Sequence, residues 1–470
     1  MNRRMILISI IVFCFSDQVW GEKRIIPIIE GQWWRVTSNP DLGAYTSDRQ
    51  QPVDFGVWQA ADGTWQLWSC IRNTKCGGNT RLFYRWEGKH LTDSNWTPMG
   101  IAMEAELELG ETVGGLQAPH TVQYEGLYWM AYGDWNNICF ATSKDGKHFE
   151  RRIQPNGKTG VFTEGPGANT RDAMLIRIDG MWHCYYTGFP GGQGFAFCRT
   201  SPDLRRWSHS SVVSYGGRIG TSGVQNECPH VVEVLPGEFV FFRNQYYGKD
   251  QRNWVYHSNN PLNFGINDDS KLVTSLEIAA PEIILHEGKY YIASLTAGLD
   301  GMRIARLRWA WIDDVGEAVF DFDNAEERQG WRKTEGNLEG VFTTSKRSGF
   351  TPRSRHFIGT GETREGHLND GLTGVIESPP FVLDRETYTL LVSGGANQEH
   401  TFVSVMDAET GKTLARFSGK NNNTLASQSF DARPHVGKRV RIQIVDRGKD
   451  GWSHINFGGI YMQGKPEIFK

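Results

Sequence analysis

Between residues 30 and 310, hydrophobic and aromatic residues alternate with polar ones in short runs that are separated by glycine-containing turns. Alternation with a period of two, beside Gly or Asp-Gly turns, is the signature of β-hairpins. Helical periodicity is almost absent from this region. The pattern therefore predicts an all-β fold. Five runs start with an equivalent turn: "DGTWQLWSC" at 62, "EGLYWMAYG" at 125, "DGMWHCYYTG" at 179, "PGEFVFFRN" at 236 and "EGKYYIASL" at 287.

The five runs recur at a nearly constant interval. Their turn glycines, from Gly63 to Gly288, follow one another after about 50 to 60 residues, and each interval holds several strand-like pieces. This period is typical of one blade of a β-propeller, and five such units close a ring. We therefore predict a five-bladed β-propeller over residues 22–312.

The texture of the sequence changes after residue 310. Segments such as "GLTGVIESPPFVLDRETYTLLVSGG" and "KRVRIQIVDRGKDGWSHINFGGIYM" alternate like strands and are joined by Gly, Asp and Asn turns. This pattern is typical of a β-sandwich. We predict a second, β-sandwich domain over residues 318–465.

The N-terminus resembles an export signal. "MNRR" is a basic start, "MILISIIVFCF" is an apolar run too short to span a bilayer, and small residues follow near Gly21. We predict a signal peptide over residues 1–21 and a secreted or periplasmic protein without a membrane anchor. Six cysteines follow the signal; Cys70 with Cys76 and Cys184 with Cys198 could form disulfides, or all could be small buried residues.

Charge and composition narrow the class of partner. The formal net charge is -3 and no basic block is present, so neither nucleic acid nor a membrane surface is an expected partner. The 17 tryptophans, 15 tyrosines and 25 phenylalanines suit both sugar stacking and a β-rich core. No phosphate-binding loop and no metalloprotease motif is found, so we expect neither a cofactor nor a metal.

Acidic residues recur on the strand that leads into each repeated hairpin. The positions before the five glycines carry Asp54, His120, Asp172, Glu227 and Glu282. In a propeller these innermost strands converge on one channel, so the acids are expected to meet there. Carboxylates held together repel, and one then keeps its proton to higher pH. A protonated and an ionised carboxyl at the same pH are what glycoside hydrolysis requires.

The motifs around these acids resemble a known group of enzymes. An acid in the first repeat, Arg171-Asp172 opening the third and Glu227-Cys228 opening the fourth resemble the five-bladed propeller glycosidases, closest to glycoside hydrolase family 32 and more distantly family 43. The resemblance implies that Asp54 is the nucleophile, or in family 43 the base toward water. It implies that Glu227 is the general acid and Asp172 the third acid, with Arg171 bracing both the carboxylates and an oligo- or polysaccharide substrate.

The resemblance leaves the substrate open. "QQPVDFGVW" has no Asn before Asp54 and no Pro after it, and "RDA" replaces Arg-Asp-Pro in the third motif. The alternatives are a family-32-like hydrolase of β-fructofuranosides or related furanosides, a family-43-like inverting arabinofuranosidase or xylosidase, and a non-catalytic carbohydrate-binding propeller. The elements "SPPF", "SGG" and "WSHINF" resemble the C-terminal sandwich of family 32 enzymes.

Four further residues are candidates, and three of them have two interpretations each. His120 could contact the substrate or be a hydrogen-bonded structural residue. Trp58 and Trp135 could stack on sugar rings or belong to the core. Glu282 could face the channel like the other acids.

Overall fold

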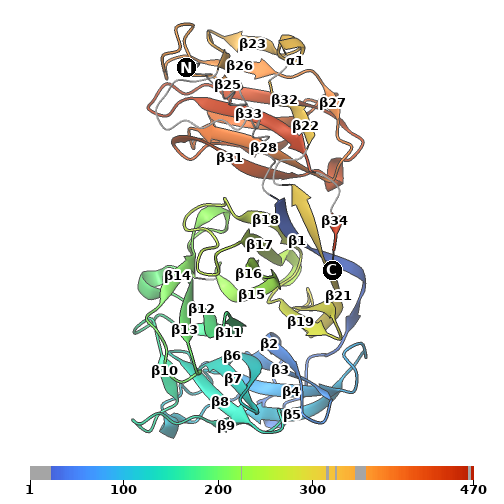
Figure 1. Cartoon of the computed structure of the whole chain (residues 1–470), viewed down its shortest axis with the longest axis vertical. Helices are drawn as coiled ribbons and strands as arrows, with labels where there is room; N and C mark the ends of the chain where they lie inside the picture. Colours follow the sequence, from blue (N-terminus) through green and yellow to red (C-terminus); the bar gives the residue numbers. More distant parts are fainter. Residues whose placement is uncertain are drawn as a thin grey trace, which may run out of the picture. The chain divides into compact units, whose positions relative to one another are not determined.

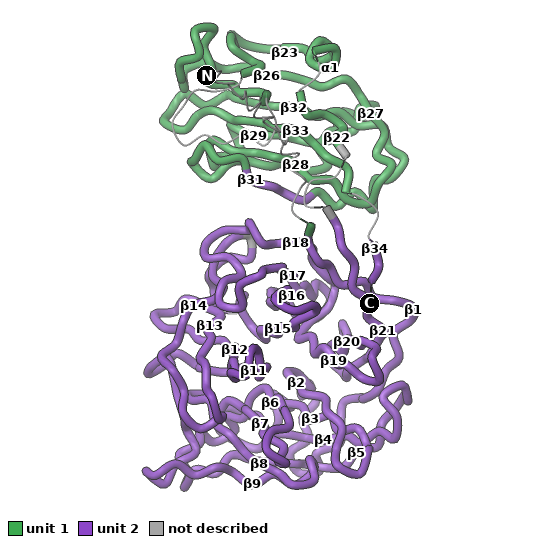
Figure 2. Tube along the Cα trace, in the orientation of Figure 1, with its two compact units in different colours: residues 1–23, 313–425, 430–464 green, residues 24–312, 426–429, 465–470 purple. Residues whose placement is uncertain are grey.

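The computed structural model describes residues 23–223, 225–313, 317–322, 325–343, 356–463 and 467–469. The predicted signal peptide, residues 1–21, lies outside the described residues. The chain divides into two compact units, which Figure 2 colours separately. Unit 2 holds residues 24–312, 426–429 and 465–470, and the other residues form unit 1. Strands form nearly all of the regular secondary structure in both units, in agreement with the predicted all-β class.

Unit 2 contains five antiparallel sheets. Four of them are formed by strands consecutive in sequence, and the fifth joins strands from both ends of the chain. The sheets consist of β2(Gln51–Gln59), β3(Trp65–Arg72), β4(Leu82–Gly88) and β5(Thr97–Met103); β6(Gln117–Tyr124), β7(Leu127–Gly133), β8(Ile138–Ser143), β9(Glu150–Arg151) and β10(Gly160–Phe162); β11(Arg171–Ile178), β12(Met181–Gly188), β13(Phe195–Ser201) and β14(Ser211–Ser214); β15(Glu227–Leu235), β16(Glu238–Tyr246), β17(Arg252–Ser258) and β18(Leu272–Leu276); and β1(Lys23–Arg35), β19(Glu282–His286), β20(Lys289–Leu295), β21(Met302–Asp313) and β34(Glu467–Ile468).

One edge strand of each sheet, here called its innermost strand, contacts the innermost strands of two other sheets, so that the five form a closed cycle. β2 touches β6 and β19, β11 touches β6 and β15, and β15 touches β19. Figure 1 shows the five strands around a common centre. This is a propeller-type arrangement, in which side chains far apart in sequence reach the same axis.

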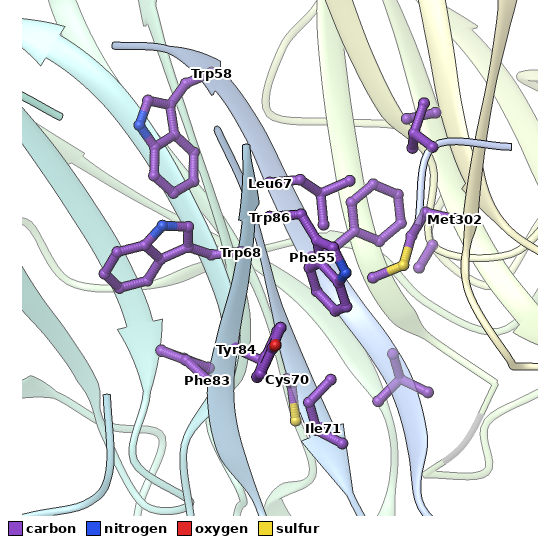
Figure 3. Close-up of a cluster of buried hydrophobic side chains, with 14 of the residues drawn as sticks. Phe55, Trp58, Leu67, Trp68, Cys70, Ile71, Phe83, Tyr84, Trp86 and Met302 are labelled. Carbon is purple, nitrogen blue, oxygen red and sulfur yellow. The ribbon is translucent and has the colours of Figure 1, made fainter. Parts of the chain in front are cut away.

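The second strand of each sheet explains the strong hydrophobic signal of the repeats. β3 is buried at every position except its last, and β12 at every position except its first. A strand covered on both faces reads as a nearly continuous apolar run instead of an alternating one. Its aromatic side chains belong to buried clusters such as that of Figure 3, which joins Trp68 of β3 with Phe83 and Trp86 of β4.

Unit 1 contains two six-stranded antiparallel sheets around a separate apolar core. Its one α-helix in the described part of the chain is α1(Ala325–Gln329), and no helix among the described residues is long and apolar enough to cross a bilayer. One sheet consists of β22(Glu317–Phe320), β24(Phe342–Thr343), β25(Phe357–Gly359), β28(Thr387–Gly394), β31(Asn422–Asp431) and β33(Ile455–Met462), and the other of β23(Arg332–Gly336), β26(Gly374–Glu377), β27(Phe381–Val382), β29(Thr401–Asp407), β30(Thr413–Phe417) and β32(Arg439–Asp446).

All six described cysteines are free thiols, and four of them are buried. Cys184 and Cys198 do lie on adjacent strands, but Cys198 stands opposite Tyr185 and not opposite Cys184. Side chains alternate between the faces of a sheet, so the two thiols point to opposite faces. The sequence left open whether the cysteines form disulfides or are small buried residues, and in the structure they are free thiols.

Candidate active site

A bulge recurs near the start of the innermost strands. The ladder register shifts there in β2, β6, β11 and β15. One residue at each shift has a positive φ, which side chains other than glycine rarely adopt and which often marks a functional position. The equivalent residue of the fifth sheet precedes β19. These five residues are Asp54 (φ 37°), Ala118 (φ 44°), Asp172 (φ 57°), Cys228 (φ 48°) and Ala280 (φ 47°).

The bulges correct the alignment of the repeats that the sequence suggested. His120 and Glu282 were matched to Asp54, but the residues equivalent to Asp54 are Ala118 and Ala280. His120 and Glu282 come two positions later. Because side chains alternate along a strand, a shift of two keeps the same face and moves the residue one level deeper along the channel. The residues that were predicted to form one ring therefore lie at two separate levels along the channel.

The upper level brings Asp54, Asp172 and Glu227 together, as the sequence predicted. Cys228 links the two aspartates: its Sγ lies 3.3 Å from Asp54 Oδ1, and its backbone N–H donates to Asp172 Oδ2 at 3.2 Å. Arg171 links the other pair, because Nη2 contacts Glu227 Oε1 and Nε lies 3.5 Å from Asp172 Oδ2. Three acids from three different sheets thus share one network.

Arg171 is held between these acids and an aromatic ring. Its side chain is 5% exposed, its Nη1 donates to the carbonyl of Asn169 at 3.1 Å, and its guanidinium lies 4.3 Å from the ring centre of Phe189. A guanidinium fixed on so many sides is rigid. The structure therefore has Arg171 as a brace for the carboxylates, which is one of the two roles that the resemblance implies.

The electrostatics of the site single out Asp172. Burial raises the pKa of Asp172 well above the ordinary value, Arg171 opposes this effect, and the neighbouring carboxylates of Asp54 and Glu227 raise the pKa further. The Oδ1 atom of Asp172 has no hydrogen-bond partner among the described residues. One carboxyl of the trio thus keeps its proton to higher pH, as repulsion predicts. That carboxyl is Asp172.

Two residues of the site were missed by sequence reasoning. Tyr247 Oη lies 3.4 Å from Asp54 Oδ1 and 3.3 Å from the Cys228 thiol. Tyr247 follows the last residue of β16, just as Phe189 follows the last residue of β12. In a hairpin the second strand ends beside the start of the first. The position directly after each second strand was therefore the sequence feature from which Phe189 and Tyr247 could have been predicted.

The deeper level joins His120, His230 and Glu282. His120 Nδ1 lies 3.3 Å from Glu282 Oε2, and His230 Nδ1 lies 3.6 Å from Oε1. Burial alone would raise the pKa of Glu282, but the facing His230 and His120 outweigh burial and lower it to about 2. His120 and Glu282 line a cavity of about 20 Å³ together with Asp54 and Asp172, and also a cavity of about 540 Å³ further along the strands. The level therefore lies below the acid trio.

These three side chains are the group in the described residues that could hold a metal, since their ligand atoms lie within 4.8 Å of one another. Their hydrogen bonds indicate protonated ring nitrogens in place of metal ligands. His230 Nε2 accepts the N–H of Ile283 at 3.2 Å, so its proton is on Nδ1, facing Glu282. His120 Nε2 lies 3.2 Å from the carbonyl of Leu175, which it can only contact as a donor. The arrangement is that of a carboxylate between two imidazoles.

Two predicted sugar contacts have other surroundings. Trp58 is 6% exposed, its indole N–H donates to the Gly146 carbonyl at 2.8 Å, and its ring packs on Trp68 in the cluster of Figure 3. It is a buried core residue that also lines the cavity of about 540 Å³. Trp135 is half-buried beyond the end of β7 under the guanidinium of Arg81, 4.8 Å from the ring centre. None of its described contacts involves the acids.

Comparisons with known proteins point to glycoside hydrolases. No protein-family model matches this chain. A curated protein of Aspergillus rugulosus named "Putative glycosyl hydrolase ecdE" is 37% identical over 268 residues, which are 55% of this chain and 32% of that protein. The chain thus matches about a third of the length of that relative. Among solved structures, a thermostable family-43 glycoside hydrolase has 16% identity and a TM-score of 0.43 over 58% of this chain and 93% of its own. The family 32 β-fructofuranosidase of Bombyx mori has 12% identity and a TM-score of 0.42 over 93% and 94%.

Proposed function

We propose that this protein is an exported glycoside hydrolase that cleaves a terminal bond of a β-fructofuranoside or related furanoside with paired carboxylates. In this proposal unit 2 is a five-bladed β-propeller with the active site at its axis, and unit 1 is a β-sandwich. The observation that carries the proposal is the convergence of Asp54, Asp172 and Glu227 from three sheets onto one network around Arg171 and Cys228.

Asp54 is the group that attacks the anomeric carbon as the bond to the leaving oxygen breaks, and water deprotonated by Glu227 then releases the sugar from Asp54. A nucleophilic carboxylate has to be ionised and held in one orientation. The thiol of Cys228 and the hydroxyl of Tyr247 both lie within donor distance of its Oδ1. Hydrogen bonds to a carboxylate favour its ionised form and leave Oδ2 as the attacking atom.

Glu227 delivers the proton that the leaving group needs, and Asp172 lies in the same network. Both carboxyls contact Arg171, and repulsion within the trio favours one retained proton. The side chain of Glu227 is 14% exposed and that of Asp172 is 2% exposed. Glu227 is therefore the member of the pair that reaches the leaving oxygen, and Asp172 binds sugar hydroxyls.

Variants at the two reacting carboxyls test the proposal. The purified protein is assayed on fructans, arabinans, xylo-oligosaccharides and nitrophenyl glycosides, beside Asp54→Asn and Glu227→Gln. We expect the parent to release one sugar and Asp54→Asn to be inactive on every substrate. Loss of the general acid should lower kcat about 10²–10⁴-fold on poor leaving groups. A dinitrophenyl glycoside needs no protonation to depart, so Glu227→Gln should release dinitrophenolate in the first turnover at nearly the parent rate. Only the later hydrolysis of the glycosyl-enzyme, for which Glu227 is the base toward water, should be slow.

Glu233→Gln is the matched control, because Glu233 lies on the same strand and accepts the N–H of Gly237 in the hairpin turn. It should keep the parent activity. If Glu227→Gln lowered the rate of the first turnover equally on poor and on dinitrophenyl leaving groups, this would contradict the acid role of Glu227. Glycan binding without any release of sugar by the parent would favour a non-catalytic propeller.

A further inference from the structure

Trp452 stands out in the turn between β32 and β33 of unit 1. Its side chain is 41% exposed, whereas the other tryptophans in the described ranges are buried or half-buried. Its backbone has φ 64°, a conformation that costs a bulky residue about 1–2 kcal/mol. An exposed indole on a strained backbone contributes little to the core, so its position needs another reason.

The turn that presents Trp452 is fixed from several sides. Asp370 Oδ2 accepts the backbone N–H of Trp452 at 3.1 Å, and Asp370 Oδ1 lies 2.6 Å from Nδ1 of the buried His454. The ring of His454 lies behind the indole, 5.6 Å away between ring centres and tilted by 30°. A side chain at Gly395 would approach the carbonyl of Trp452 to 2.1 Å. The indole is therefore held in place before any ligand arrives.

Amide side chains are linked to the residues that hold this indole. Nε2 of His454 lies 3.1 Å from Asn423 Oδ1, and the neighbouring Asn421 and Asn422 are exposed. Asn421 is tied to the glycine turn beside Trp452, because its Oδ1 accepts the N–H of Ala396 at 2.9 Å. Amides donate and accept hydrogen bonds without charge. A flat apolar ring next to neutral amides fits a neutral, polyhydroxylated ligand.

We infer that Trp452, clamped by Asp370 and His454 and flanked by Asn421–Asn423, is a glycan-docking platform in unit 1. The indole stacks on the C–H face of a sugar ring, and the amides bond its hydroxyls. One exposed ring is far too small for a stable interface between two copies, which buries about 1,200 Å² or more. The site rests on the proposed function only for the choice of glycan.

Binding of the full chain to polysaccharides tests this inference. In a Glu227→Gln background, which removes turnover, affinity electrophoresis is run in levan, inulin, arabinan and xylan. We expect retardation by at least one of these glycans, and Trp452→Ala should weaken it about 10-fold or more. Trp452→Phe, which keeps a flat ring, should restore most of it. Val436→Ala, at a half-exposed apolar residue of the same unit, is the matched control and should bind like the parent.

The outcomes separate this platform from the active site. With Glu227 intact, Trp452→Ala should hydrolyse a short nitrophenyl glycoside at the parent rate. If the parent were inactive on every substrate but still bound a glycan through Trp452, the proposed function would fail and the platform would stand. Equal binding by the Trp452→Ala and parent chains, or no retardation by any of the four glycans, would overturn the platform.

Discussion

At Asp54, a thiol and a phenol converge on one carboxylate oxygen. Burial, followed by the neighbouring Cys228, Glu227 and Asp54, raises the pKa of Tyr247 far above its ordinary value. The hydroxyl therefore stays protonated at any working pH and is available as a donor to Asp54 Oδ1. This makes Tyr247 a positioning residue for the proposed nucleophile.

Removal of this donor should affect catalysis more than stability. Tyr247→Phe keeps the ring but loses a hydrogen bond to a charged group, which is worth about 1.5–3 kcal/mol. We expect kcat/KM on a nitrophenyl glycoside to fall at least about 10-fold with a nearly unchanged Tm. Tyr246→Phe is the control, because Tyr246 is the adjacent residue and is 45% exposed. Parent-like activity of Tyr247→Phe would show that Cys228 alone orients Asp54.

At the scale of elements, the level formed by His120, His230 and Glu282 ties three sheets together. His120 comes from β6, His230 from β15 and Glu282 from β19, and these strands belong to different sheets. The ionised Glu282 is 15% exposed and faces both imidazoles. The pKa of Glu282 falls from the ordinary 4.5 to about 2, which corresponds to about 3 kcal/mol of stabilisation of the carboxylate at about 1.36 kcal/mol per pKa unit.

Glu282→Gln should therefore destabilise unit 2 by about 3 kcal/mol, measured by urea unfolding at pH 7. The pKa of Glu282 is about 2 in the folded protein, below that of an unfolded chain, so its contribution is full above about pH 4 and is lost as the pH falls toward 2. The difference from the parent should shrink over that window. Glu287→Gln, on the same hairpin with a 78% exposed side chain, should change the unfolding free energy by less than about 0.5 kcal/mol. An unchanged stability of Glu282→Gln would contradict a structural role for this level.

The strands were predictable from sequence, but the offsets within them were not. Buried second strands and turn glycines announce each hairpin, and the motifs around Asp172 and Glu227 indicated which strands carry acids. The bulges were invisible, because Asp54, Ala118 and Cys228 share a backbone conformation but no side-chain type. A bulge adds one residue to a strand, and the spacing to the next glycine does not record where it was added.

The same limit applied to tryptophan. Alternation in "PVDFGVW" places Trp58 on the same face as Asp54, and the sequence left open whether its ring stacks on a sugar or belongs to the core. The strand continues past the acids into the core, and Trp58 finds Trp68 and Phe149 there. Depth along a strand depends on tertiary packing, which a pattern of period two does not contain.

At the scale of the whole molecule, the two units have separate hydrophobic cores. Each unit is large enough to unfold as its own cooperative transition. Unit 1 also buries a carboxyl. Asp446 is fully buried at the end of β32, its Oδ2 lies 2.5 Å from Thr360 Oγ1, and its Oδ1 has no hydrogen-bond partner among the described residues. Burial, with a smaller effect of Asp370, raises the pKa of Asp446 to about 7.

This carboxyl should make unit 1 less stable as the pH rises. The folded-state pKa of Asp446 exceeds the unfolded value of about 3.9, so its stabilising proton is fully retained below about pH 4 and is lost through about pH 7. Asp446→Asn imitates the protonated acid, because its amide oxygen accepts from Thr360 Oγ1 as the carboxyl does and the side chain does not titrate. Scanning calorimetry measures the Tm of the unit 1 transition. We expect the Tm of the variant minus that of the parent to be several degrees larger at pH 8 than at pH 5. Glu399→Gln, at an exposed residue of the same unit, should show no such dependence. An equal difference between Asp446→Asn and the parent at both pH values would mean that Asp446 is already ionised in the folded protein.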